Sequence, residues 1–317
     1  MTPSTLVSVQ GLSRYYGALC AVDNLDFQMQ RGEVLGFLGP NGAGKSTTMQ
    51  MISGNLAPSS GRILINDVDL LDEPKRAKAD IGYLPEQPPL YRELTVDEYL
   101  RFCARLNRIP RHKVAAAMAS AKLRCGLQQV GRRLIANLSK GYQQRVGIAQ
   151  AIIHAPAVVI LDEPTVGLDP IQIREIRQLI RELGGEHSVI LSTHILPEVQ
   201  AICDRVQIIN RGKLVLSDTL EGLNRQCQSS AIIARFVHAP ELASLTALAD
   251  IIRVDDLGDA RFRLHHAPTA DPAPVLAASA INKGWGLLEL TPERRTLEEI
   301  FVDITSRDDT AGEASAA

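Results

Sequence analysis

A glycine-rich loop between a strand-like run and a helix-like run constrains the fold of this chain more than any other feature. The loop reads GPNGAGKST over residues 39–47, and the apolar run Val34–Leu38 comes directly before it. Residues 47–52 continue in a helix-like pattern. Glycines let the backbone curl tightly and turn successive N–H groups inward, which forms an anion-binding nest. This strand–loop–helix context predicts a phosphate-binding loop in an α/β protein.

The residues of this loop have separable expected roles. The Lys45 ammonium can reach the β- and γ-phosphates of a nucleotide, and the Ser46 hydroxyl can ligate Mg²⁺. A helix opening at Gly44 adds the positive end of its dipole. A glycine turn with an incidental lysine is the alternative, and the flanking runs argue against it. The residues expected to bind the phosphates are Gly39, Pro40, Asn41, Gly42, Ala43, Gly44, Lys45, Ser46 and Thr47.

Length and composition exclude several classes of protein. At 317 residues and 45% hydrophobic residues, the chain can form one large α/β domain and a smaller one. Lys+Arg 34 against Asp+Glu 36 gives a net charge of −2, so we expect no nucleic-acid partner. Five scattered cysteines without a CxxC pair indicate reduced thiols and no zinc site. The N-terminus lacks an apolar signal core, and the longest apolar stretch, residues 155–161, is too short to span a bilayer. We expect a cytoplasmic protein that reaches a membrane only through a partner.

Strand-like and helical runs alternate along the first 220 residues, which predicts a layered α/β domain with a largely parallel central sheet. Short β segments at the start indicate an antiparallel sheet beside it. Residues 95–126 are helix-rich, with Leu100, Ala104 and Leu106 at helical spacing, and predict a helical subdomain over about residues 87–155. The expected strands are Leu6–Val9, Ala21–Met29, Val34–Leu38, Ile63–Ile65, Ile81–Leu84, Val158–Leu161, Val189–Leu191, Val206–Ile209 and Leu214–Leu216.

A polar break at residues 226–230 predicts a boundary between a domain of residues 1–225 and a small α/β domain of residues 231–305. A further helix is expected over Leu297–Ile304, and the small, polar tail 306–317 is expected to be disordered. The small domain has the order strand, helix, strand, strand, helix, strand, which is the ferredoxin-like βαββαβ pattern. Its expected elements are residues 232–237, 240–247, 251–254, 261–264, 274–282 and 286–290.

Two polar motifs follow apolar strands and complete a nucleotide site. The strand Val158–Leu161 ends in Asp162 and Glu163. Beside a phosphate loop, Asp162 would hold Mg²⁺ directly or through water, and Glu163 would polarise the attacking water. Without that loop, the pair would be an ordinary solvated strand end. His194 closes another apolar strand, where it could contact the γ-phosphate and the water, although a lone histidine is more often a packing or surface residue.

A second anion site is predicted where Leu138–Arg145 opens a long helix running to Ala155. Ser139 is the expected N-cap, and Ser139, Lys140 and Gly141 together with the helix N-terminus make a second anion site. An ordinary capped helix is the alternative. Since the phosphate loop already surrounds one nucleotide, a second site in the same chain suggests that it serves a nucleotide held by another copy.

Taken in order, these motifs resemble those of the ATP-binding subunits of ABC transporters, over about residues 5–220. The resemblance implies a P-loop NTPase fold of the ABC type, with ATP and Mg²⁺ as ligands and with Lys45, Glu163 and His194 as catalytic residues. It also implies a head-to-tail homodimer that encloses two ATPs between Walker A of one chain and the signature of the other. Tyr16 matches the aromatic residue that stacks on adenine, with a core tyrosine as the alternative. The matching motifs are Gly39–Thr47 for Walker A, Leu138–Gln143 for the signature, Val158–Glu163 for Walker B, Gly167–Asp169 for the D-loop and His194 for the switch histidine.

Two departures narrow the resemblance to ABC-2 exporter subunits of the gliding-motility and drug-exporter type. The signature reads LSKGY where many relatives have LSGGQ, and Glu86 stands at the usual Q-loop glutamine. The run TLEEIF at residues 296–301 is similar to the same subfamily. A carboxylate at Glu86 can still bind Mg²⁺ through water, so the resemblance implies altered coupling and not lost activity.

The subfamily implies a polytopic ABC-2 membrane subunit as partner and a peripheral position at the cytoplasmic face of the cell membrane. Residues 86–94 would contact that subunit, or would form only a rigid proline turn. A soluble ABC ATPase acting on DNA or the ribosome is a second hypothesis, but the expected second nucleotide domain or coiled-coil insertion is missing from the sequence. A regulatory switch without turnover is a third, and the intact Lys45, Asp162, Glu163 and His194 argue against it.

Overall fold

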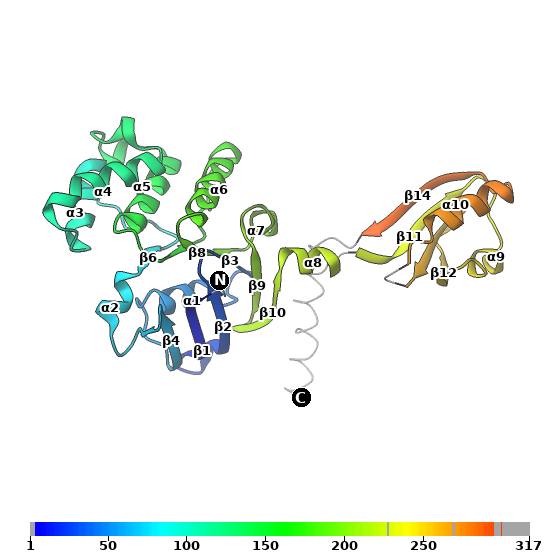
Figure 1. Cartoon of the computed structure of the whole chain (residues 1–317), viewed down its shortest axis with the longest axis horizontal. Helices are drawn as coiled ribbons and strands as arrows, with labels where there is room; N and C mark the ends of the chain where they lie inside the picture. Colours follow the sequence, from blue (N-terminus) through cyan, green and yellow to red (C-terminus); the bar gives the residue numbers. More distant parts are fainter. Residues whose placement is uncertain (1–3, 227, 268–269, 295–298, 300–317) are drawn as a thin grey trace. The chain divides into compact units, whose positions relative to one another are not determined.

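The computed structural model describes residues 4–226, 228–267, 270–294 and 299. The chain divides into two compact units, Met1–Leu220 and Glu221–Ala317. Figure 1 shows the elements of each unit along the chain.

The first unit is built on a central sheet with the strand order β10-β9-β3-β8-β7-β6. All neighbouring strands are parallel except β10, which runs antiparallel to β9. Every residue of β3, β7 and β8 is buried, in agreement with the apolar runs Val34–Leu38, Val158–Leu161 and Val189–Leu191 in the sequence. The predicted largely parallel sheet is thereby confirmed. The strands are β3 (Val34–Leu38), β6 (Ile81–Leu84), β7 (Val158–Asp162), β8 (Ser188–Thr193), β9 (Arg205–Asn210) and β10 (Lys213–Thr219).

A second sheet, with the order β2-β1-β4-β5, is antiparallel throughout, as the sequence predicts. The first strand, Thr5–Tyr16, is longer than the predicted Leu6–Val9 because the ladder continues into the exposed residues Tyr15 and Tyr16. Phe27 of this sheet packs edge-on against Phe37 of the central sheet, with the ring centroids 5.0 Å apart. One continuous core therefore contains side chains from both sheets. The strands are β1 (Thr5–Tyr16), β2 (Leu19–Gln30), β4 (Ser60–Ile65) and β5 (Val68–Asp69).

Helices α3, α4 and α5 all lie between β6 and β7 in the chain and form one group in Figure 1. Thr95 and Glu98 form a capping box that starts α3. Leu100 and Ala104 are buried as expected, but Leu106 is 64% exposed, because six residues from Leu100 it lies on another face of the helix. The helices are α1 (Lys45–Ile52), α2 (Pro74–Ala79), α3 (Val96–Leu106), α4 (Arg111–Arg124), α5 (Lys140–Ile152), α6 (Pro170–Gly184) and α7 (Leu196–Ile202), with short 3₁₀ turns at Gln128–Val130 and Ile135–Asn137.

The second unit forms an antiparallel sheet with the order β12-β13-β11-β14. Together with the element order βαββαβ, this is the ferredoxin-like arrangement. Its core includes Phe236, Phe262, Leu264 and Leu276. The predicted helix at Leu297–Ile304 and the tail 306–317 fall outside the described residues, apart from Glu299. The elements are α8 (Leu220–Gln226), β11 (Gln228–Phe236), α9 (Leu242–Thr246), β12 (Ile251–Asp256), β13 (Arg261–His266), α10 (Ala273–Asn282) and β14 (Leu287–Arg294).

The cysteines within the described residues are free thiols. Burial raises the pKa of the Cys103 thiol to about 11 and that of Cys125 to about 12, so both are protonated and unreactive at neutral pH. Within the described part of the chain, none of the helices combines the length and the apolar character that crossing a bilayer requires.

Candidate nucleotide-binding site

The phosphate loop leaves the end of β3 and enters α1 one residue later than predicted, at Lys45. Gly44 is the N-cap with φ of 102°, and Gly42 has φ of 80°, conformations that L side chains rarely adopt. A Cβ at Gly44 would collide with the Ala21 carbonyl oxygen, whereas one at Gly42 would meet nothing within 4 Å. The loop is therefore packed tightly on its inner side and open at its tip, where Pro40, Asn41 and Gly42 are exposed.

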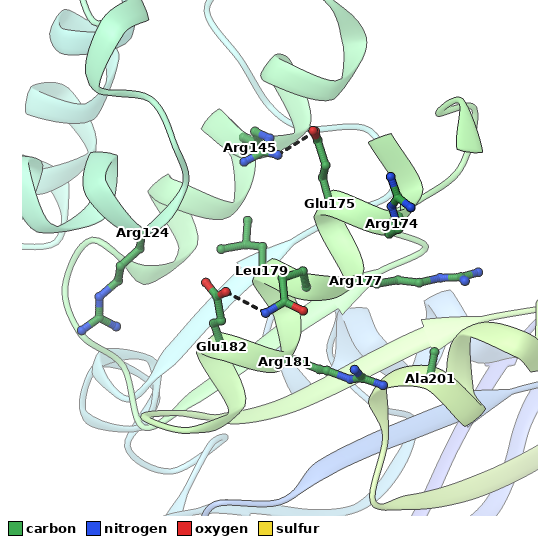
Figure 2. A pocket seen from close by; sticks show the side chains of 10 residues that line it. Arg124, Arg145, Arg174, Glu175, Arg177, Leu179, Arg181, Glu182 and Ala201 are labelled. Carbon is green, nitrogen blue, oxygen red and sulfur yellow. Dashed lines mark hydrogen bonds and ion pairs between the residues drawn. The ribbon is translucent and has the colours of Figure 1, made fainter. Parts of the chain in front are cut away.

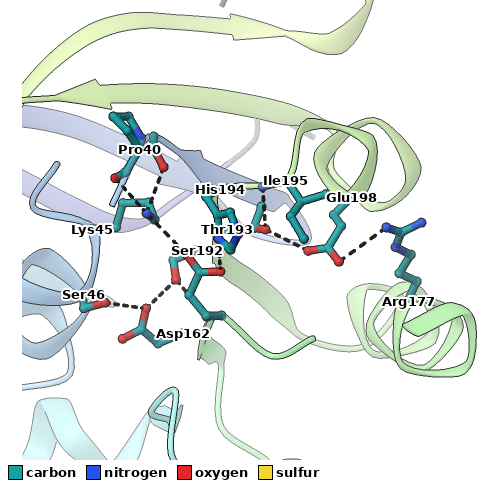
Figure 3. A network of polar contacts seen from close by, with 12 residues as sticks. Pro40, Lys45, Ser46, Asp162, Arg177, Ser192, Thr193, His194, Ile195 and Glu198 are labelled. Carbon is teal, nitrogen blue, oxygen red and sulfur yellow. Dashed lines mark hydrogen bonds and ion pairs between the residues drawn. The ribbon is translucent and has the colours of Figure 1, made fainter. Parts of the chain in front are cut away.

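The Lys45 side chain folds back across the loop and is only 5% exposed. Its ammonium donates to the carbonyl oxygens of Gly39 at 2.9 Å and Pro40 at 3.2 Å. It also forms an ion pair with Glu163 Oε1 at 3.3 Å (Figure 3). The phosphate loop and the carboxylate strand, far apart in the sequence, thus meet at a buried cation.

Asp162 is the last residue of β7 and is 2% exposed. Ser46 Oγ donates to its Oδ1 at 3.1 Å, and Ser192 Oγ donates to the same oxygen. Burial, together with the negative charges of Glu163 and Glu86, raises the pKa of Asp162, while the two serine hydrogen bonds oppose that shift. Two of the three residues predicted to hold Mg²⁺, Ser46 and Asp162, are therefore in contact, and a bound cation would stabilise the charged form of the buried Asp162 carboxylate.

Ser192 has no role in the sequence prediction, although it belongs to the strand that His194 closes. In the structure it lies opposite Asp162 on the neighbouring strand β8 and is fully buried. Its hydroxyl also accepts the Glu163 backbone N–H at 3.0 Å. Correct pairing of β7 with β8 would have identified it, because residues in register on parallel strands share a face.

Glu163 follows the strand with φ of 47°, in the left-handed region. That conformation costs a non-glycine residue about 1–2 kcal/mol. The side chain is buried between two partners: Oε1 contacts Lys45, and Oε2 is 2.9 Å from His194 Nδ1. The structure thus brings the three predicted catalytic residues into one cluster, with Glu163 at its centre.

The residues around His194 fix its strand end through a network that sequence reasoning missed (Figure 3). Thr193 Oγ1 donates to Glu198 Oε2 at 2.8 Å and accepts the Ile195 backbone N–H at 3.1 Å. Glu198 lies in α7, is fully buried, and pairs with Arg177 of α6 at 3.4 Å. A buried charge with two partners can hold a turn in one conformation.

The signature residues lie at the start of α5, which ends at Ile152 and not at the predicted Ala155. Ser139 is its N-cap, as predicted, and accepts the Tyr142 N–H at 3.4 Å. Gly141 is buried against Gln172, which a Cβ at this position would approach to 2.8 Å. Ser139 and Gly141 line a pocket of about 730 Å³ that Asp169 and Gln172 also line, and none of the described residues of the phosphate loop lines it. The structure does not bring the signature onto the loop of its own chain.

Arg145 joins the signature helix to two neighbours. Its guanidinium donates to the Cys125 carbonyl oxygen at 3.1 Å and pairs with Glu175 of α6 at 2.8 Å. Figure 2 shows this ion pair across a cavity of about 620 Å³ between α5 and α6. Because α6 begins directly after the D-loop, with Asp169 as its N-cap, Arg145 connects the signature helix to the helix that follows the D-loop.

Tyr16 ends β1 and is 47% exposed, so the alternative of a core tyrosine is wrong. The Arg14 guanidinium lies over the Tyr16 ring, 4.7 Å from its centre, in a cation–π contact. Glu86 is also exposed. It lines a pocket of about 490 Å³ that Lys140 and Gln143 also line. Two of the three positions that depart from the common motifs, Glu86 and Lys140, thus line one pocket, whereas the third, Tyr142, lines the pocket beside Ser139 and Gly141.

Comparison with known proteins agrees with this geometry. The family model for ABC transporters matches residues 22–166. An uncharacterised ABC transporter ATP-binding protein of Bacillus subtilis, YxlF, is 32% identical over 94% of this chain and 99% of its own length. The daunorubicin resistance ATP-binding protein DrrA3 of Streptomyces coeruleorubidus is 31% identical over 98% of this chain and 99% of its own length. A solved structure of an ATP-binding subunit of an ABC transporter is 34% identical and covers 70% of this chain and 93% of its own, with a TM-score of 0.63. The chain belongs to the family of ABC transporter ATP-binding proteins.

Proposed function

We propose that this chain is the ATPase that powers an ABC-2 type membrane exporter. The cluster in which Glu163 contacts both Lys45 and His194, beside the Ser46–Asp162 contact, carries the proposal. As a member of its family the chain is an ATPase. The ABC-2 partner, the peripheral position at the cytoplasmic face of the membrane and the roles of individual residues are the proposed part.

Mg²⁺ fits the residues that are present. Mg²⁺ prefers hard oxygen ligands and is held in nucleotide sites by few protein groups together with phosphate oxygens. The Ser46 hydroxyl and the Asp162 carboxylate offer such oxygens next to the phosphate loop, and the raised pKa of Asp162 shows that its charge is poorly compensated there. Ser46 and Asp162 would hold the ion, with Glu86 as a further ligand through water. When bound, Mg²⁺ would neutralise charge that develops on the phosphates.

Hydrolysis would begin with an exchange of partners at Lys45. The ammonium is held by two loop carbonyls and by Glu163. The γ-phosphate of ATP, with more negative charge, would draw the ammonium toward the loop tip and release one oxygen of Glu163. That oxygen would then orient the attacking water, while His194 keeps its contact with the other oxygen and fixes the carboxylate plane.

The signature would act on the nucleotide of a second copy. Ser139 and Gly141 lie beside the D-loop helix of their own chain, in a pocket apart from Lys45. A solved cassette from this fold, MJ0796, is described as a dimer. We therefore propose a head-to-tail homodimer in which each composite site combines Walker A, Tyr16 and Walker B of one chain with the signature of its partner.

The membrane subunit would contact the segment after β6. Tyr91 is 48% exposed and packs edge-on against Phe102 and Tyr99, while the Tyr99 hydroxyl donates to the Pro89 carbonyl oxygen at 3.0 Å. A rigid turn that presents an exposed aromatic ring suits a protein interface.

Three relatives suggest the kind of export. They are the bacitracin transport protein BcrA of Bacillus licheniformis, the linearmycin resistance protein LnrL of Bacillus subtilis and DrrA3, 40%, 31% and 31% identical to this chain. We propose export of a compound of this antibiotic-like class.

Two experiments test the proposal. Glu163→Gln keeps the size of the side chain but removes its charge and replaces one acceptor oxygen by an NH2 donor, so it should bind ATP, lose turnover and accumulate as a dimer in size-exclusion chromatography with ATP. Glu182→Gln on the exposed side of α6 is the matched control and should behave as the parent. A Glu163→Gln variant that hydrolyses ATP at the parental rate would refute the catalytic assignment. Affinity purification from membranes should recover a polytopic ABC-2 subunit; recovery of ribosomes or DNA instead would refute the exporter.

A further inference from the structure

The net charge of −2 conceals a strong asymmetry along the chain. Residues 87–155 contain twelve Lys and Arg against three Asp and Glu, a net charge of +9. The remaining residues carry 22 Lys and Arg against 33 Asp and Glu, a net charge of −11. Charge separated to this degree points to a polyanionic partner for the basic part. The helices α3, α4 and α5 belong to that part.

Most of these cations are not used in ion pairs of the fold. Lys122 pairs with Asp97, Arg124 with Glu186 and Arg145 with Glu175. Across the described parts of the chain, by contrast, no ion pair involves the exposed residues Arg101, Arg105 and Arg111. In the cavity of Figure 2, three of the five lining arginines, Arg124, Arg145 and Arg177, have a carboxylate partner, whereas none of the three arginines at the α3–α4 groove has one among the described residues.

Arg101, Arg105 and Arg111 share one groove. It lies between α3 and α4, has a volume of about 460 Å³, and is lined by Arg101 and Arg105 from α3 and by Arg111 from α4. The Asp97–Lys122 pair, with 2.6 Å between Oδ1 and Nζ, also lines it. Its apolar lining comes from α4 and consists of Val114, Ala115, Met118 and Ala119.

Exposed apolar side chains accompany these cations on the same two helices. Phe102 and Leu106 of α3 are 38% and 64% exposed, and Leu123 of α4 is 66% exposed. Arginines next to exposed large apolar side chains are typical of surfaces that lie in the interface of an anionic membrane. A soluble phosphate would need the cations but not the apolar lining or these neighbours.

We propose that the groove formed by Arg101, Arg105 and Arg111 binds the head groups of anionic phospholipids and docks the α3–α4 hairpin on the membrane surface. The phosphates would pair with the guanidinium groups, and the glycerol and upper acyl carbons would contact Val114, Ala115 and Ala119. This proposal rests on the proposed function in one respect, because the membrane subunit would bring the chain close to the bilayer in the cell. The binding of lipid head groups is a property of the chain alone. It requires neither that subunit nor ATP.

Vesicle flotation with the full chain tests the proposal without nucleotide or membrane subunit. We expect binding to vesicles of phosphatidylcholine mixed with phosphatidylglycerol, weaker binding at high salt, and little binding to phosphatidylcholine alone. Since each cation near an anionic surface strengthens partitioning about fivefold, the triple variant Arg101→Gln, Arg105→Gln and Arg111→Gln should bind on the order of a hundredfold more weakly. Its ATPase activity should equal that of the parent, which shows that the variant is folded.

A charge-matched control separates the groove from net charge. Lys75→Gln, Arg174→Gln and Arg181→Gln remove the same charge from exposed positions of α2 and α6 and should leave vesicle binding unchanged. Equal loss in both triple variants would overturn the proposal, as would equal binding to vesicles with and without phosphatidylglycerol. Binding to a single-stranded oligonucleotide that exceeds vesicle binding, and depends on the same arginines, would assign the groove to nucleic acid and also overturn it. Absence of ATPase activity in the parent would refute the proposed function and leave this test intact.

Discussion

The contact between Ser192 and Asp162 predicts a change in Mg²⁺ dependence from a substitution that leaves all three expected Mg²⁺ ligands in place. Ser192→Ala removes one hydroxyl that donates to the Asp162 carboxylate and accepts the Glu163 N–H at 3.0 Å. The Glu163 N–H keeps its bond to the Ser192 carbonyl oxygen at 3.1 Å and is not left without a partner. The main loss is therefore one hydrogen bond to a buried carboxylate.

The size of this loss follows from the charge of the acceptor. A hydrogen bond to a charged group stabilises a fold by about 1.5–3 kcal/mol. For a unit of 220 residues, a loss of about 2 kcal/mol lowers Tm by about 4–8 °C. Substitution of a residue that orients a metal ligand typically weakens metal binding by about 10–100-fold. We therefore expect the free Mg²⁺ concentration that half-saturates ATPase activity to rise by that factor.

The assay is ATPase activity against free Mg²⁺, with Tm measured in parallel. Ser188→Ala is the matched control, because Ser188 is buried at the start of the same strand and its hydroxyl accepts the Gly32 N–H at 2.8 Å, away from the carboxylates. It should lower Tm and leave the Mg²⁺ dependence unchanged. Ser192→Thr restores a hydroxyl and should recover part of the affinity. A folded Ser192→Ala protein with parental Mg²⁺ dependence would show that Asp162 needs no such support.

Three further perturbations test the site. Lys45→Ala removes a charge-assisted contact worth about 1.5–3 kcal/mol and should weaken ATP binding about ten- to a hundredfold by calorimetry; parental affinity would contradict the phosphate-loop assignment. Asp162→Asn should raise the Tm of the nucleotide-free protein at pH 7 while abolishing turnover. Burial raises the pKa of Asp162, so the folded state binds this proton more tightly than the unfolded state does. Ionising the buried carboxyl therefore lowers the free energy of unfolding. This loss is absent below the unfolded pKa of about 3.9 and complete above the raised folded pKa. The gain should therefore shrink as the pH falls toward 4, and a pH-independent gain would contradict this origin. Ser139→Arg should keep ATP binding to the monomer but block the closed dimer. Mixing it with Lys45→Ala should restore some ATPase activity, because one composite site of a mixed dimer then carries both substitutions and the other carries neither. If Ser139→Arg abolishes ATP binding by the monomer, the signature acts within its own chain.

The sequence was most informative where a motif is both local and chemically demanding. The loop at residues 39–47, the strand that ends in Asp162 and the cap at Ser139 each combine a backbone signal with a side-chain signal, and each is found where predicted. The order and pairing of the C-terminal strands followed from alternating elements. Leu106 shows the limit of this approach, since helical spacing alone did not establish which face it occupies.

Contacts that depend on strand register or on distant helices could not be predicted in this way. Ser192 reaches Asp162 only because β7 and β8 pair in one register. The buried Glu198 is held by Thr193 from β8 and by Arg177 from α6, and a glutamate in a short amphipathic helix reads as a surface residue. The total charge does not reveal the basic helical part, because its net charge and that of the acidic remainder nearly cancel in the sum.

The left-handed backbone at Glu163 has an evolutionary consequence. Glycine adopts φ of 47° without strain, and asparagine does so more readily than glutamate. Under selection for folding alone, position 163 should therefore be among the first in the site to change, toward glycine or asparagine. A library selected only for heat resistance should enrich these residues at 163, whereas one also selected for growth on a toxic export substrate should retain glutamate. Retention of glutamate in the second library alone would show that turnover, and not folding, selects the residue at this strained turn.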